Sequence, residues 1–94
     1  AGRALYGQHC AVCHGAGGRG DGLAAAGLEP PPADLVLHVP QHSDGELFHF
    51  VTRGIRGTAM PAWGRTLSER ERWVLVIYLR ELARVPSGAA DRGR

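Results

Sequence analysis

The chain has 94 residues, a formal net charge of +2 with histidine taken as neutral, and cationic side chains that are all arginine. This length predicts one domain, and arginines scattered among acidic residues argue against a nucleic-acid partner. The longest apolar run, from Trp73 to Leu79, has seven residues, far fewer than the roughly 20 of a membrane span. Fourteen glycines and six prolines predict a fold with many turns and loops.

The first predicted element is a helix over residues 2–14. Leu5, Tyr6 and His9 supply its inner face. Gly2 lies four residues before Tyr6 and therefore shares its face, where the missing side chain permits close contact with another helix. We expect this face to pack against a second helix of the same domain.

The end of this helix reads Cys10-Ala11-Val12-Cys13-His14, which is the pattern for covalent attachment of a c-type haem. Each thiol adds across one vinyl group of the porphyrin, and two intervening residues let one helical turn present both sulfurs. His14 follows directly, so its neutral imidazole can reach the iron. We therefore predict one haem c, attached through Cys10 and Cys13, with His14 as a metal ligand.

Two other interpretations of the thiols are weaker. A redox Cys-x-x-Cys pair usually lies between a strand and a helix, and the sequence has no convincing strand pattern. A zinc site would need a second Cys-x-x-Cys pair or two histidines at finger spacing. His38 and His42 are four apart, but 23 residues separate His14 from His38, which exceeds the interval of a zinc finger.

Glycines over residues 15–22 interrupt any regular element, and a helical turn can form over residues 23–26. These glycines do not cradle a phosphate, because no Lys-Ser/Thr ending follows them. Pro30-Pro31-Pro32 is a rigid, extended segment. It is either a simple connector or the source of a backbone carbonyl that accepts the proton-bearing nitrogen of His14 and orients the imidazole.

Two capping boxes predict the remaining helices. Ser43 with Glu46 begins a helix that runs to about residue 53, and Ser68 with Glu71 begins one that runs to about residue 84. The last predicted helix is apolar all round at its centre, so we expect it to be buried on more than one side. One side should pack against the helix over residues 2–14 and another against the haem. The predicted domain spans residues 1–85, and residues 86–94 form a tail or linker.

Met60 is the only methionine of the chain and lies in the loop between the last two helices. A thioether sulfur is a soft ligand that raises the reduction potential of haem iron, so Met60 is the predicted second metal ligand. Pro61 stiffens this loop. The alternatives are that Met60 only packs, or that His38, His42 or His49 takes the position.

Trp63, Arg53 and Arg56 flank the Met60 loop. An indole N–H or a guanidinium can bind the haem propionates. The competing interpretation is that the arginines lie at the surface and the tryptophan lies in the core. We include Arg53 and Trp63 among the candidate cofactor-binding residues.

Over residues 2–84 the chain resembles the class I cytochrome c family, specifically its short bacterial domains. The resemblance implies an all-α fold of three main helices around one haem, with crossed terminal helices, His14 proximal and Met60 distal. Leu23 departs from the family, in which proline is frequent at this position. Among Pro30, Pro31 and Pro32, we favour the carbonyl of Pro31 as the partner of His14. The matching segments are residues 10–15, Gly20-Asp21-Gly22, residues 30–35, Gly54-Ile55, residues 57–61 and residues 73–79.

The predicted function is one-electron transfer to or from a respiratory oxidase, reductase or dehydrogenase, with no catalytic residues in this chain. We expect its partners to be redox proteins or a fused redox domain. We also expect a monomer, with membrane tethering through a parent polypeptide as an option. No signal peptide is visible, so we expect a processed protein or an excised domain. The family resemblance implies that haem is attached outside the cytoplasmic membrane, so we expect the domain in the periplasm or on the exterior face of that membrane. The alternatives are a haem enzyme or gas sensor with a labile methionine, and a non-haem thiol or zinc module.

Overall fold

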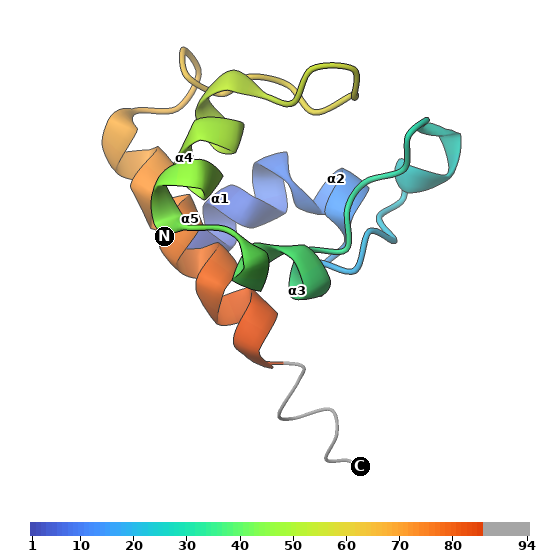
Figure 1. Cartoon of the computed structure of the whole chain (residues 1–94), viewed down its shortest axis with the longest axis horizontal. Coiled ribbons are helices and arrows are strands. Elements are labelled where there is room, and N and C mark those ends of the chain that lie inside the picture. Colours follow the sequence, from blue (N-terminus) through green and yellow to red (C-terminus); the bar gives the residue numbers. More distant parts are fainter. Residues whose placement is uncertain (86–94) are drawn as a thin grey trace.

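The computed structural model describes residues 1–85, and the predicted tail or linker over residues 86–94 lies outside them. The described residues are helical and contain no strand, which confirms the all-α prediction. The longer helices are α1, α4 and α5, and Figure 1 shows how they are arranged. The elements are, in order, α1 (Gly2–His9), α2 (Ala11–His14), η1 (Ala25–Gly27), α3 (Leu35–His38), η2 (Val39–Gln41), α4 (Asp44–Arg53) and α5 (Glu69–Val85).

Helix α1 packs against α5, as the sequence predicted. A Cβ atom placed on Gly2 would lie only 2.7 Å from Cβ of Tyr78, so glycine allows the two backbones to approach. One turn further along, the rings of Tyr6 and Tyr78 lie 5.4 Å apart. The buried Tyr6 therefore fixes the crossing of the first and last helices.

The single helix predicted over residues 2–14 is wrong in one detail. Helix α1 ends at His9, and Cys10 takes φ −116° and ψ −34°, away from regular helical geometry. The short helix α2 then carries Val12, Cys13 and His14 and ends at Gly15, whose φ is +84°. The break sets the attachment motif on its own turn.

Both predicted capping boxes are present. Ser43 Oγ accepts from the N–H of Glu46 at 3.1 Å, and Glu46 Oε1 accepts from the N–H of Ser43 at 2.8 Å. Ser68 and Glu71 make the same pair of bonds, at 3.1 and 2.8 Å. These bonds satisfy amide groups that the first turn leaves without helical partners, so α4 and α5 begin where the local sequence directs them.

The hydrophobic core joins α5 to α1, α4 and η2. Leu75, Val76 and Leu79 of α5 are buried, but Ile77 is 66% exposed, so the expectation of burial on more than one side holds for part of the helix only. In Figure 1 the segment after α4 lies at the top, α2 lies below it and α3 lies lower still. Within the described residues, no helix has the length and apolar character needed to cross a membrane.

Candidate cofactor site

A cavity of about 350 Å³ collects the sequence-predicted site residues. Cys10, Cys13, His14 and Met60 all line it, although Met60 is far from the others in sequence. Most of the remaining lining is apolar and comes from α4, α5 and the segments around α3. The walls therefore bring two thiols, an imidazole and a thioether to one apolar space.

The two thiols belong to one helical turn. The amide of Cys13 donates to the carbonyl of Cys10 at 3.2 Å, and the amide of His14 donates to the same carbonyl at 2.9 Å. Burial, followed by the neighbouring Cys13, raises the pKa of Cys10 to about 11. Among the described residues, no cluster of three His, Cys, Asp or Glu side chains is arranged to hold a metal ion.

His14 is oriented by a backbone carbonyl, but the carbonyl is that of Ala33, 3.1 Å from Nδ1. The prediction of Pro31 as this partner is therefore corrected, although Pro31 does line the cavity. The amide of Leu35 donates to the carbonyl of Gly18 at 2.6 Å, and this bond ties the segment beyond the prolines to the loop after His14. It is this tie that brings Ala33, two residues before Leu35, beside the imidazole.

The bond to Ala33 fixes the tautomer of the His14 imidazole. A carbonyl can only accept, so the bond to Ala33 requires the proton on Nδ1 and leaves the lone pair on Nε2. Burial lowers the pKa of His14, and the bond to Ala33 opposes this effect in part. The neutral, oriented imidazole is the form that binds haem iron.

Met60 is held by a compact turn. Its amide donates to Thr58 Oγ1 at 3.2 Å, and the Thr58 hydroxyl donates to the carbonyl of Ile55 at 2.7 Å. Gly54, with φ +72°, would bring a Cβ within 2.8 Å of the Met60 carbonyl. A side chain at Gly54 would therefore displace the backbone that carries the thioether.

The other predicted residues divide into two groups. Trp63 lines the cavity and its ring lies 4.8 Å from that of His9. Arg53 and Arg56 are exposed, and none of the described residues that line the cavity is an arginine. Binding of haem propionates by Trp63 or Arg53 stays a prediction.

The structure also shows polar contacts of Tyr6 and His42 that the sequence did not predict. Tyr6 Oη donates to the carbonyl of Gly15 at 2.6 Å, just beyond the attachment motif. His42 lines the cavity, with Nδ1 3.3 Å from Glu46 Oε1. The N–H of Ser43 and the His42 side chain lower the pKa of Glu46. The i, i+4 spacing of His42 and Glu46 was the available signal for that pair.

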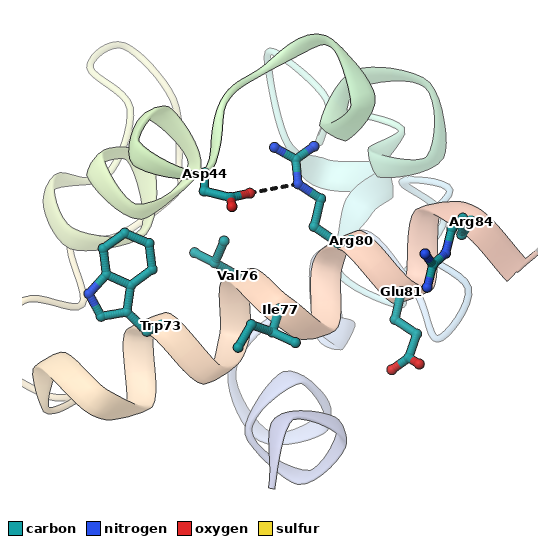
Figure 2. Close-up of a pocket in the computed structure, with 7 residues that line it drawn as sticks. All are labelled: Asp44, Trp73, Val76, Ile77, Arg80, Glu81 and Arg84. Atoms are coloured by element: carbon teal, nitrogen blue, oxygen red, sulfur yellow. Dashed lines mark hydrogen bonds and ion pairs between the residues drawn. The ribbon is translucent and has the colours of Figure 1, made fainter.

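A second, shallower hollow of about 220 Å³ lies between the start of α4 and α5. Figure 2 shows Trp73 and Ile77 beside the ion pair between Arg80 Nε and Asp44 Oδ1, which are 2.8 Å apart. Among the described residues, none that lines this second hollow is a cysteine, histidine or methionine. Of these two hollows, the larger cavity has the donor set and the apolar walls that fit a covalently attached haem.

Comparison with known proteins agrees with this chemistry. A family model described as cytochrome c oxidase, cbb3-type, subunit III, matches residues 1–79. A solved structure of the Kuenenia stuttgartiensis reducing HAO-like protein complex Kustc0457/Kustc0458 is 31% identical, with a TM-score of 0.75 over 86% of this chain. This chain spans 41% of the length of that one.

A second solved structure is that of the KustC0563 c-type cytochrome. It is 25% identical, with a TM-score of 0.71, and the match covers 86% of this chain and 95% of the other. The family match spans both thiols, His14 and Met60. The chain belongs to the cbb3-type cytochrome c oxidase subunit III family and is a class I c-type cytochrome domain, an electron-transfer module with covalently bound haem c.

Proposed function

We propose that this domain is a one-electron carrier in which His14 and Met60 are the two axial ligands of the haem iron. The observation that carries the proposal is the presence of both donor side chains in the cavity that also holds both thiols. When bound, haem c supplies a reversible one-electron ferric–ferrous couple. The protein supplies attachment, both axial ligands and an apolar enclosure.

Each ligand has a distinct role. His14 donates through Nε2, and its bond to Ala33 makes it a stronger donor, which favours the ferric state. Met60 supplies a soft thioether, which favours the ferrous state and raises the potential. With both positions taken by protein side chains, no coordination site is left for a substrate, so electron transfer is favoured over ligand chemistry.

An apolar surface near the attachment turn is the proposed place of contact with redox partners. Val12, between the two cysteines, is 52% exposed, and Leu23 is 98% exposed. The amide of Ala24 donates to the Val12 carbonyl at 2.8 Å, so the two exposed side chains belong to adjoining backbone. Contact through such a surface shortens the path to the haem edge, and its dependence on salt should be weak.

The partners proposed are redox proteins, or redox domains of the same polypeptide, that belong to a respiratory oxidase, reductase or dehydrogenase. The family description, which names an oxidase subunit, supports this class. Covalent haem attachment supports a location in the periplasm or at the exterior face of the cytoplasmic membrane. Within that setting we propose a monomeric domain, tethered through its parent polypeptide where one exists.

Carbon monoxide binding to the reduced holoprotein tests the carrier function. A six-coordinate low-spin ferrous haem that resists carbon monoxide at neutral pH supports it, because both ligands come from the protein. Rapid and complete binding contradicts it and supports a haem enzyme or gas sensor with a labile methionine. A protein purified from cells with haem-attachment machinery and lacking a Soret band contradicts haem binding altogether.

A further inference from the structure

We propose that Arg72 is a positioning residue for Met60. By donating hydrogen bonds to residues at both ends of the segment that carries Met60, Arg72 keeps the thioether on the haem iron. Arg72 lies near the start of α5, and the segment in question runs from residue 54 to residue 68. The inference rests on the proposed His14 and Met60 ligation. In it, Arg72 keeps the sixth coordination position of the iron occupied by Met60.

One guanidinium contacts both ends of the segment. Arg72 Nη1 donates to the hydroxyl of Thr52 at 2.8 Å, at the end of α4 that precedes the segment. Arg72 Nε donates to the carbonyls of Leu67 and Ser68, at 3.2 and 3.3 Å, where the segment meets α5. The planar fork of arginine is suited to such divergent donation, whereas lysine presents a single ammonium group.

The same end of α4 is where the segment returns to the helix. The amide of Trp63 donates to the Val51 carbonyl at 3.0 Å, and the amide of Gly64 donates to the Thr52 carbonyl at 3.0 Å. Thr52 is therefore bonded through its carbonyl to the returning chain and through its hydroxyl to Arg72. Loss of the bond between Arg72 and Thr52 therefore weakens the attachment of the Met60 segment to the end of α4.

The guanidinium is itself fixed by aromatic packing. Its Cζ atom lies 5.1 Å from the centre of the Phe48 ring. Phe48 in turn stacks on Trp73, with centroids 4.0 Å apart and planes 17° from parallel. Arg72 is partly buried in this setting, so its hydrogen bonds count for more than those of a solvated surface arginine.

The turn around Met60 depends on these ends. The hydrogen bonds described for Thr58 and Met60 run within the turn, to Ile55 and to Thr58. After Gly54, the described backbone bonds from this segment to α4 come from Trp63 and Gly64, and they end at Val51 and Thr52. A segment held at so few points opens as a unit with less than the global free energy of unfolding. Loss of Arg72 should therefore raise the fraction of molecules in which Met60 is detached.

Arg80 provides a matched control on the same helix. Its Nε donates to Asp44, and its Nη1 and Nη2 donate to the carbonyls of Val39 and His42 at 2.9 and 2.5 Å. Figure 2 shows its contact with Asp44 at the start of α4. Arg80 thus makes as many bonds as Arg72, but it holds the segment around η2 and not the Met60 segment.

The experiment compares holoproteins carrying Arg72→Met, Arg72→Lys, Thr52→Val and Arg80→Met with the wild type. Two quantities are measured in the ferric state: the rate at which added imidazole displaces Met60, and the denaturant midpoint for loss of the Met–iron charge-transfer band. Global unfolding is followed separately by circular dichroism. Methionine keeps the apolar stem, lysine keeps the charge, and valine removes only the Thr52 hydroxyl.

We expect Arg72→Met to raise the rate of imidazole binding about tenfold, as the loss of a charged donor's hydrogen bonds implies. Arg72→Lys and Thr52→Val should give smaller increases, and they keep the inference testable if Arg72→Met does not fold. Arg80→Met should lower global stability but change the imidazole rate less than about twofold, which is near the scatter for distant, independent sites.

Equal effects of the Arg72 and Arg80 substitutions on the imidazole rate would overturn the role of Arg72, as would no effect of either. Both outcomes leave the ligand assignment standing, provided that the wild type shows the Met–iron band. A wild type without that band overturns the proposed ligation and the role of Arg72 together. The two failures are therefore distinguished within one set of spectra.

Discussion

The Nδ1 atom of His14 lies 3.1 Å from the carbonyl oxygen of Ala33, and this bond fixes which imidazole nitrogen faces the cavity. Gly20 packs against the same carbonyl. With φ +83°, it would bring a Cβ atom within 3.3 Å of the Ala33 oxygen and 2.8 Å of the Pro32 oxygen. The electronic character of His14 therefore depends on a glycine that lies in another loop.

Gly20→Ala should displace the Ala33 carbonyl and weaken its bond to His14. Because a weaker bond makes the imidazole a poorer donor to ferric iron, the midpoint potential should rise on the order of tens of millivolts. Potentiometric titration of the two holoproteins measures the change. Gly17→Ala is the control, since a Cβ atom on Gly17 would have no neighbour within 4 Å; equal shifts in both variants would refute the explanation.

Tyr6→Phe removes the buried hydroxyl that donates to the Gly15 carbonyl at 2.6 Å. The loss should cost about 0.5 to 1.5 kcal/mol of the free energy of unfolding at neutral pH, the usual net value of one hydrogen bond, because the Gly15 carbonyl keeps its bond from the Gly18 amide at 3.1 Å. Urea unfolding of the holoprotein, monitored by circular dichroism, gives this value. A stability equal to that of the wild type would show that the bond contributes nothing.

The same substitution should change how stability depends on alkaline pH. Burial raises the pKa of Tyr6 in the folded protein, whereas the unfolded phenol titrates near its ordinary value of about 10. Above about pH 10 the unfolded chain loses this proton first, so the wild-type free energy of unfolding falls as pH rises. Tyr6→Phe should lack this component of the slope, and identical slopes in the two proteins would contradict the assignment.

Gly2→Ala tests the crossing of α1 and α5. A Cβ atom there would lie 2.7 Å from Tyr78 Cβ and 3.2 Å from the Val74 carbonyl, and neither atom can rotate away. The substitution should lower stability by about 1 to 3 kcal/mol. Gly7→Ala, on the same helix with nothing within 4 Å, should raise stability by about 0.5 to 1 kcal/mol. The midpoint temperature of thermal unfolding should therefore fall for Gly2→Ala and rise for Gly7→Ala.

The local sequence predicted those parts of the fold that depend on neighbouring residues. The boxes of Ser43 with Glu46 and of Ser68 with Glu71 are contained within four residues each, so their positions follow directly from sequence. Gly2 was likewise identified, because its spacing from Tyr6 places both on one helical face. Short helix α3 was missed, since its cap, Asp34, follows a proline run that indicated only extended chain.

The site was predictable by residue type and not by tertiary position. Cys10, Cys13, His14 and Met60 carry chemistry that few other side chains offer, and all four line the cavity. The partner of His14 was misassigned, because which carbonyl reaches the ring depends on the bond between Leu35 and Gly18. Arg72 carries no sequence signal that separates it from the exposed Arg70; only packing against Phe48 and Thr52 does so.

Removal of the thiols should separate covalent from non-covalent haem binding. Cys13→Ala should retain haem through one thioether when the protein is denatured in acid. The double substitution Cys10→Ala and Cys13→Ala should release all haem, because only axial ligation and packing would remain. Haem staining of a denaturing gel measures the outcome, and haem retained by the double variant would contradict attachment at these residues.

The midpoint potential of Met60→His, measured beside the wild type, tests the His14 and Met60 ligation most directly. An imidazole lacks the preference of the thioether for ferrous iron, so the potential should fall well below that of the wild type. The Met–iron charge-transfer band of the ferric protein should vanish while the haem stays low-spin. An unchanged potential together with an unchanged ferric spectrum would show that Met60 does not bind the iron and would contradict the account.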